Sequence, residues 1–514
     1  MEQGNDVYEN QELPIAASDV DCILLTHAHI DHSGLIPLMY VNGFRGQVYS
    51  TSATAQLCEI MLRDSAHIQM FEAEWRNRKA ARSGGKLKEF VPLYDMDAAV
   101  NVCKQFVGCE YDRVYDIAEG IKIRFTDVGH LLGSASIEVW ATEKTENGDV
   151  TEKIVFSGDI GNINKPIIKD PKHVRDADYV VMESTYGNRS HGGTPNYVED
   201  LTDIFKRTFE RGGNVVIPSF AVGRTQELLY IIRKIKEDNL VGRDFDVYMD
   251  SPLAIEATNI FIKNVESCFD DEAVELVRKG INPLSFPGLK YATTGDESKQ
   301  INFDPNPKVI ISSSGMCEAG RIRHHLKHNL WRPECTIVFV GYQAVGTTGR
   351  IIVDGAEEIK LFGEPIQIKA EIVQLKGSSG HADKDGLLCW INAFDTKPKK
   401  VFVVHGEDSV CDEFTECLKE EYGYDAMAPY TGGSYDLIAD RVISEGVKER
   451  KTRRTTSTQR GKTVFDRLVA AGKRLMTVIT HNEGGTNKDL AKFTDQINAC
   501  LLYTSPSPRD MRRS

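Results

Sequence analysis

The chain has 514 residues, a length that allows about two to four domains and more than one hydrophobic core. Its 41% hydrophobic and 27% charged residues are typical of a soluble globular protein, and no apolar run reaches the roughly 18 residues of a membrane span. The net charge of −13 argues against indiscriminate binding to nucleic acid but leaves room for a local cationic groove. The cysteines form no CxxC pair and the acidic start differs from a secretion signal, so a reducing, cytoplasmic location is expected.

Short β-branched runs alternate along the chain with amphipathic stretches of helical period. The runs that indicate buried strands cover residues 22–26, 153–157, 179–182, 214–220, 308–315, 336–343 and 401–404. Strands that alternate with helices predict an α/β protein. Residues 143–153 are expected to form an exposed hairpin that turns at Asn147-Gly148. In α/β folds functional groups gather where strands end, and ligand-type side chains do follow several of these runs.

The segment THAHIDH (26–32) follows the first predicted strand and holds three histidines and an aspartate. In an extended loop alternate side chains point the same way, so His27, His29 and Asp31 can converge. His32 would reach the same cluster from the first turn of a helix. Imidazole nitrogens with one carboxylate suit zinc or a similar transition metal. These four residues could fill one closed site, whereas two metals with open positions need further ligands.

Isolated histidines and an aspartate after other strands could supply those ligands. They are His130 in DVGHLLGSA, Asp159 in VFSGDIG, His381 in KGSSGHADKDG and His405 in VFVVHGEDS. Each of them alone is as compatible with a structural role as with metal binding. Their shared position after predicted strands favours a common site.

Six motifs, spread over about residues 20–435, resemble in sequence and order those of the β-CASP branch of the metallo-β-lactamase superfamily. They are THAHIDH, GHLLGSA, SGDIG, ESTYGNR, GHAD and VHGE. That branch includes the cleavage-and-polyadenylation endonuclease and its bacterial and archaeal ribonuclease relatives. The resemblance implies an α/β fold, a metallo-β-lactamase αββα sandwich with an inserted α/β (β-CASP) domain.

The resemblance also implies a division of the chain into domains. The expected parts are a first metallo-β-lactamase part over 1–185, the β-CASP domain over 186–365 and a second metallo-β-lactamase part over 366–440. The first part is expected to lack its N-terminal strands, because THAHIDH lies closer to Met1 than in the family. A basic, helical extension is expected over 441–499, and its run at 447–462 is as compatible with a solvated linker as with a binding segment. Residues 500–514 match the translation of a sequencing adapter and are excluded from fold reasoning.

The resemblance implies a site with two zinc ions that activate a water for in-line attack on a phosphodiester. The implied ligands are His27, His29 and His130 for one ion, Asp31, His32 and His405 for the other, and Asp159 as the bridge. Glu183 would orient His381, which would protonate the leaving oxygen. The catalytic residues would then be His381, Glu183, Asp31 and Asp159. Asp383 fits either a partner of this site or an ordinary helix-start carboxylate.

Three stretches of the expected β-CASP domain are candidates for contact with RNA phosphates. They are SFAVGRTQE (219–227), SSSGMCEAGR (312–321) and GYQAVGTTGR (341–350). Each brings glycine turns, hydroxyls or amides to the N-terminus of a predicted helix, and such N-termini bind anions. Ordinary strand-to-helix turn chemistry is the alternative for each. The candidate substrate-binding residues are Arg224, Ser313, Ser314 and Arg350.

These features lead to the hypothesis that the chain is a zinc-dependent ribonuclease that cuts single-stranded RNA. Endonucleolytic RNA processing is favoured over trimming from an end. RNA-processing members of the family resemble this chain in the histidine at position 405, where DNA-repair members tend to carry an apolar residue. The alternatives are a DNA nuclease or another hydrolase on the same fold, and an inactive RNA-binding fragment. The resemblance allows a homodimer and implies no membrane partner. His324, His325 and His328 are expected on a helix surface that faces solvent or RNA.

Overall fold

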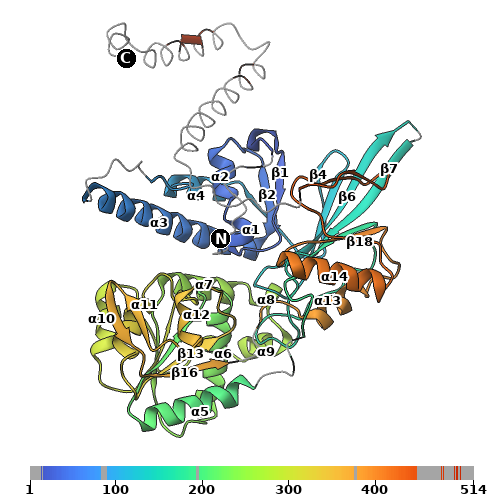
Figure 1. Ribbon diagram of the computed structural model, residues 1–514. Coiled ribbons are helices and arrows are strands. Elements are labelled where there is room, and N and C mark those ends of the chain that lie inside the picture. The colour runs from blue at the N-terminus through green and yellow to red at the C-terminus, as the bar shows by residue number, and fades with distance from the viewer. Residues whose placement is uncertain are drawn as a thin grey trace.

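The computed structural model describes residues 13, 15–82, 90–146, 148–190, 192, 196–375 and 379–447, with six isolated positions between 476 and 498 (Figure 1). Some predictions concern residues outside these ranges. These residues are 1–12, Asn147, nearly all of the 447–462 run and the C-terminal extension, and the tail. Within them, no helix is both long and apolar enough to cross a membrane.

The first part of the chain builds a small parallel sheet covered by helices. Its three strands run in the order β1 (Cys22–Leu24), β2 (Gln47–Thr51) and β3 (Phe106–Cys109). The helices around it are the 3-10 turn η1 (Ala17–Asp19), α1 (Ile30–Ser33), α2 (Ile36–Val41), α3 (Ser52–Arg82) and α4 (Met96–Cys103). Leu24 and Tyr49 of this sheet pack against Ile123 and Phe125 of a second sheet, so the two sheets face each other.

The second sheet has seven strands in the order β18-β17-β8-β7-β6-β5-β4. The strands are β4 (Val114–Ala118), β5 (Ile121–Asp127), β6 (Ala135–Thr145), β7 (Gly148–Phe156), β8 (Tyr179–Met182), β17 (Lys400–Val403) and β18 (Ala426–Met427). The expected hairpin is confirmed, because β6 and β7 pair antiparallel, but Gly148, which was predicted in the turn, is the first residue of β7 and lies opposite Thr145. Helices α13 (Lys384–Ile391) and α14 (Asp408–Glu420) lie beside this sheet (Figure 1), and Trp390 and Phe414 share a core with Val180 and Val401. A small hairpin of β19 (Ser434–Asp436) and β20 (Arg441–Ser444) follows.

Between β8 and α13 the chain forms a separate α/β unit, seen in green and yellow in Figure 1. Its parallel sheet has the order β11-β10-β12-β9-β13-β16, with β9 (Val215–Pro218), β10 (Asp246–Met249), β11 (Leu289–Tyr291), β12 (Lys308–Ser312), β13 (Thr336–Val340) and β16 (Glu371–Leu375). Its helices are α5 (Tyr197–Glu210), α6 (Arg224–Glu237), α7 (Pro252–Lys263), α8 (Val265–Cys268), α9 (Asp271–Arg278), α10 (Gly295–Phe303), α11 (Ile322–Asn329) and α12 (Thr348–Val353). A hairpin of β14 (Glu358–Leu361) and β15 (Glu364–Gln367) completes it. Strands β12 and β13 are buried along their whole length, which is typical of a parallel sheet covered on both faces.

The predicted α/β architecture with an inserted α/β unit is confirmed, and one strand next to a predicted limit joins the inserted sheet. Strand β16 was assigned to the part that begins at residue 366, whereas Thr336–Val340 pairs in parallel with Glu371–Leu375 inside the inserted sheet. The chain therefore leaves this sheet after Leu375. Only Leu375 of this edge strand is buried, so its sequence carries no strong signal for which of the two sheets it joins. The domain limits stay predictions.

Candidate metal centre

The loop after β1 and the short helix α1 carry the first four candidate ligands. His27 is fully buried, and His29 occupies the N-cap of α1, on which Asp31 and His32 lie. The backbone of His29 accepts hydrogen bonds from the backbone amides of His32 and Ser33, and the hydroxyl of Ser33 also donates to Ala28. The expectation of an extended segment through Asp31 is therefore wrong, because these bonds wind the chain into a helix from Ile30 onward.

One group of donors converges around the buried side chains of His27 and Asp159. His29 Nδ1 lies 3.1 Å from both His27 Nε2 and His130 Nε2, and Asp159 Oδ2 lies 3.3 Å from His27 Nε2 and 3.5 Å from His130 Nε2. Four ligands that surround one zinc ion tetrahedrally at about 2.0–2.1 Å are separated from each other by about 3.3–3.4 Å. The four donor pairs with these distances thus lie close to the spacing that a zinc site requires.

A second group lies on the other side of Asp159. His32 Nε2 is 3.1 Å from His405 Nε2 and 3.3 Å from Asp159 Oδ1, and Asp31 Oδ2 is 3.6 Å from His405 Nε2. Asp159 therefore directs one carboxylate oxygen to each group. Two metal ions bridged by one carboxylate would use this arrangement.

The second nitrogen of several of these rings is held by another residue. Thr26 Oγ1 lies 3.1 Å from His27 Nδ1, Thr185 Oγ1 lies 3.1 Å from His405 Nδ1, and the Gly380 carbonyl lies 3.1 Å from His130 Nδ1. Such partners fix the tautomer and orientation of metal-ligating histidines. The sequence analysis did not single out Thr26 or Thr185, and only their adjacency to the motifs could have suggested them.

The charge balance also suits a cation. Burial alone would favour the neutral acid of Asp159, but His27 and His32 hold its pKa well below the ordinary value. Burial and the neighbouring His27 lower the pKa of His29 to about 3, so this ring is a neutral donor at pH 7. Within the described residues, Asp159 Oδ1 is buried with no hydrogen-bond partner. A metal ion would satisfy this oxygen and the facing imidazole nitrogens together.

His381 and Glu183 form a pair beside the two groups. The Glu183 carboxylate accepts a hydrogen bond from His381 Nδ1 at 3.0 Å and from the Ile160 amide at 2.5 Å. His381 Nε2 then points toward the site, 3.8 Å from Asp159 Oδ2. Burial opposes protonation of the ring, but the Glu183 charge outweighs it and raises the pKa of His381. The pair can therefore hold a proton next to the converging donors.

These converging histidines and carboxylates at the strand ends of a sandwich of two sheets define a metallo-hydrolase. Residues 225–352 match the family model of the Beta-Casp domain, and residues 365–429 match that of the Zn-dependent metallo-hydrolase RNA specificity domain. The chain is 34% identical over 390 residues to "Ribonuclease TTHA0252" of Thermus thermophilus, an alignment that covers 76% of this chain and 82% of that protein. The chain belongs to the β-CASP branch of the metallo-β-lactamase superfamily and is a metal-dependent hydrolase of that branch.

Two further relatives differ in length. The "RNase J-like protein" of Methanocaldococcus jannaschii is 31% identical over 392 residues, which cover 76% of this chain and 82% of that protein. "Transcription termination factor FttA" of Methanosarcina mazei is 32% identical over 421 residues, which cover 80% of this chain and 62% of that protein. The chain thus spans less than two thirds of this termination factor.

The candidate substrate-binding residues lie in the inserted unit, where their polar groups have local partners. Ser313 Oγ is 2.7 Å from Ser251 Oγ, and Arg350 pairs with Asp354 at 2.8 Å. Ser314 exchanges hydrogen bonds with the backbone of Ala319. These contacts do not join them to the metal centre.

Arg224 is the candidate binder whose contacts lead toward the metal centre. It is the first residue of α6, after Gly223 with a φ of +84°, and it pairs with Glu227 at 2.5 Å. Glu227 in turn contacts Lys165, which lies six residues after Asp159. The sequence analysis missed both Glu227 and Lys165. Asp383 is the N-cap of α13 and accepts a hydrogen bond from the Gly386 amide, which agrees with the helix-start alternative.

One prediction on the inserted unit is wrong. His324 and His328 are exposed, but His325 is fully buried and bonds to Asp250 at 2.6 Å. Asp250 also pairs with Arg321 at 2.6 Å. His325 is therefore part of a buried ion network and does not face solvent or RNA.

Proposed function

We propose that the chain is a zinc-dependent ribonuclease that binds two zinc ions and cuts single-stranded RNA endonucleolytically in the cytoplasm. The observation that carries this proposal is the convergence of His27, His29 and His130 with Asp159 on one side, and of Asp31, His32 and His405 with Asp159 on the other. The distances within each group suit ions of zinc's size, and the donor set of imidazoles and carboxylates is the one zinc prefers.

Each residue has a role in this proposal. The first group would hold one ion, the second group the other, and Asp159 would bridge them. The ions would supply Lewis acidity to the phosphodiester and to the attacking water. Glu183 raises the pKa of His381 against the effect of burial and turns its Nε2 toward the site, so that His381 would be able to give a proton to the leaving oxygen. Asp31 sits at the open side of the second group, with its side chain half exposed, where water can enter.

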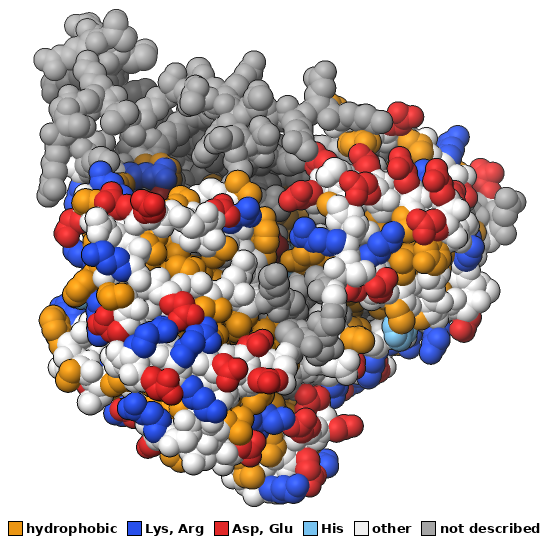
Figure 2. Space-filling model, turned by 60° about the horizontal axis from the view of Figure 1, so that its bottom comes forward, with side chains coloured by type: hydrophobic (Ala, Val, Ile, Leu, Met, Phe, Trp, Pro, Cys, Tyr) orange, Lys and Arg blue, Asp and Glu red, His pale blue; other side chains and the backbone are white. Residues whose placement is uncertain are grey.

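RNA is the substrate that the relatives and the inserted unit favour. Two of the relatives described above are named as ribonucleases or ribonuclease-like. A separate α/β unit beside the metal centre suits a polymer better than a small molecule. On the face shown in Figure 2, Lys and Arg side chains are interspersed with Asp and Glu, so this face offers no continuous cationic surface. We place the RNA along Arg224 and the metal centre, because the contacts of Arg224 with Glu227 and of Glu227 with Lys165 lead toward that centre.

Metal analysis and cleavage assays on the purified chain test the proposal. We expect two zinc ions per chain, cleavage of single-stranded RNA that a chelator abolishes and zinc restores, and weak or no cleavage of the matched DNA. A circular single-stranded RNA has no ends, so its linearisation would support endonucleolytic cutting. Cleavage of DNA at the same rate would favour the DNA-nuclease alternative. Less than one zinc ion per chain together with no cleavage would favour an inactive RNA-binding fragment.

A further inference from the structure

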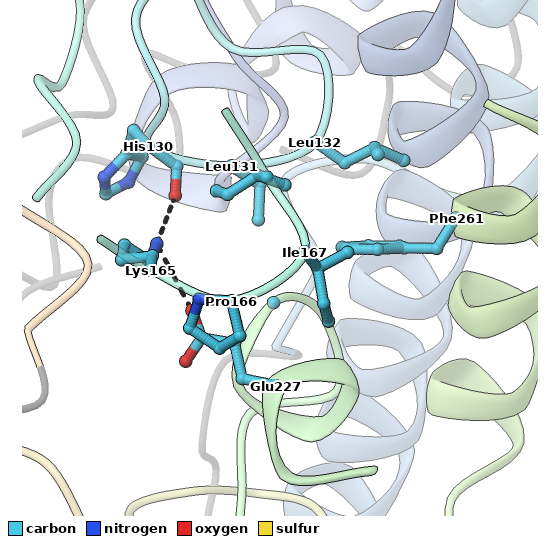
Figure 3. A pocket seen from close by; sticks show the side chains of 10 residues that line it. His130, Leu131, Leu132, Lys165, Pro166, Ile167, Glu227 and Phe261 are labelled. Carbon is cyan, nitrogen blue, oxygen red and sulfur yellow. Dashed lines mark hydrogen bonds and ion pairs between the residues drawn. The ribbon is translucent and has the colours of Figure 1, made fainter. Parts of the chain in front are cut away.

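A buried lysine connects the inserted unit to the loop that carries His130. The Lys165 side chain is only 11% exposed, and its ammonium donates a hydrogen bond to the His130 carbonyl at 2.9 Å and pairs with Glu227 at 3.3 Å. Figure 3 shows the ammonium between these two acceptors. Burial lowers the pKa of Lys165, and Glu227 opposes this change. A buried ammonium is costly unless its partners are well placed, so both contacts need a reason.

The surroundings of this ion pair are apolar and closely packed. Leu131, Ile167 and Phe261 line a cavity of about 10 Å³ next to it (Figure 3), which is at the lower limit for a single water molecule. Leu131 and Ile167 come from the first part of the chain, whereas Phe261 and Glu227 come from the inserted unit. One hydrophobic core thus crosses the boundary between the two units. In such surroundings an ion pair specifies geometry more than it adds stability.

Docking of the two units does not depend on Lys165. The Asp270 amide donates to the Ile167 carbonyl at 2.7 Å, and Ile168 and Phe269 form a β-bridge across the same boundary. What Lys165 adds is a direct link from α6 to the backbone of His130. Apart from the facing donors of the metal centre, His130 is held through its amide, which donates to Ser134 Oγ, and through its ring, which contacts the Gly380 carbonyl.

We propose that Lys165 and Glu227 are positioning residues of the metal centre, through which the inserted unit fixes the His130 loop. Lys165 holds the His130 carbonyl, Glu227 holds Lys165, and the same Glu227 carboxylate holds Arg224, the candidate phosphate binder. The inserted unit is then part of the metal site and not only a cover for the substrate. This inference rests on the proposed function, because it takes His130 as a zinc ligand.

Substitutions of Lys165 and Glu227 should impair different properties, zinc affinity in the first case and KM for RNA in the second. Lys165→Met removes the contact to His130 and leaves Glu227 paired with Arg224, so zinc affinity should fall about tenfold or more while KM for RNA changes little. Glu227→Gln keeps an oxygen for Lys165 but loses the charge that holds Arg224. Its main effect should be a higher KM, with a zinc affinity within about threefold of wild type.

Zinc affinity is measured by competition with a chelator of known affinity, and KM and kcat are measured on single-stranded RNA. Lys153→Met is the matched control, since Lys153 is equally buried and pairs with Glu138 at 2.8 Å within one sheet. It should lower thermal stability without changing zinc affinity. If Lys165→Met does not fold, the double variant Lys165→Met/Glu227→Gln removes the ammonium without leaving a buried carboxylate behind, keeps an oxygen for Arg224, and should still bind zinc more weakly.

The outcomes separate the two proposals. Zinc affinity at the wild-type level in Lys165→Met or in the double variant overturns the positioning role. So does an equal loss of affinity in Lys153→Met, because the loss would then reflect general destabilisation. A wild-type chain that binds no zinc would instead overturn the proposed function itself.

Discussion

The proposed acid, His381, gives the sharpest test of the chemistry, because a general acid matters only for a leaving group that needs a proton. A ribose 3′-oxygen is a poor leaving group, whereas 4-nitrophenolate leaves without protonation. General acid catalysis contributes about 10²–10⁴-fold, which corresponds to about 2.7–5.4 kcal/mol of barrier. The Nε2 of His381 is directed at the site because Glu183 holds its Nδ1 at 3.0 Å. His381→Ala should therefore slow RNA cleavage by about 10²–10⁴-fold.

The assay compares RNA with bis(4-nitrophenyl) phosphate under single-turnover conditions at saturating zinc. We expect His381→Ala to lower the rate on the nitrophenyl ester less than about tenfold, because the acid is dispensable there. Glu183→Gln should lie between wild type and His381→Ala on RNA, since the amide still orients the ring but no longer favours its protonation. His328→Ala, at an exposed position of α11, is the control. Equal losses on both substrates would refute the role of His381 as an acid, and zinc analysis of each variant would show whether lost metal is the cause.

Three other predictions follow from named contacts. Asp159→Ala removes the oxygen that faces each group of donors, so metal analysis should show at most one zinc ion per chain. Asp250 is buried against His325 and Arg321, and although burial acts to raise its pKa, these partners lower the pKa below its ordinary value. The ionised Asp250 carboxylate therefore stabilises the folded chain above the unfolded pKa of about 3.9, and this contribution is lost as pH falls through the folded pKa. In urea unfolding at pH 7, Asp250→Asn should lower the free energy of unfolding by about 3 kcal/mol or more. Below about pH 3 the loss should be markedly smaller. Arg224→Ala should reduce the salt dependence of kcat/KM on RNA by a slope of about 0.7, the contribution of one phosphate contact on a single strand.

Several of the site residues could be predicted from the sequence because each follows a strand that is itself easy to find, whereas His130 follows β5, which the sequence analysis did not single out. Strands β1, β7, β8 and β17 lead directly to His27, Asp159, Glu183 and His405, and parallel neighbours bring their ends to one edge of the sandwich. The local path was harder to predict. The helix at Ile30 forms because hydrogen bonds of His29 and Ser33 outweigh the extended conformation that alternation suggested.

The burial of His325 could also have been found from the sequence. Ile322, His325, Leu326 and Asn329 are spaced by three, four and seven residues, which is the period of a buried helix face, and all four are buried. The prediction gave more weight to the presence of three histidines than to this spacing. By contrast, no periodicity connects Lys165 with Glu227. Their contact depends on how the two units pack, and that packing involves apolar residues from distant segments, such as Leu131 and Phe261.

The position of the insertion explains why the two units can influence the same chemistry. Glu183 stands at the end of β8, just before the inserted unit begins, and His381 stands just after it ends, 198 residues later. Their hydrogen bond therefore joins the two ends of the insertion. The segment around His381 also pairs with the Asp159 loop, since the Ala382 amide donates to the Ile160 carbonyl at 2.7 Å. His381 is thus held to the Asp159 side by two sets of hydrogen bonds, although the last strand of the inserted sheet ends only six residues before it, at Leu375.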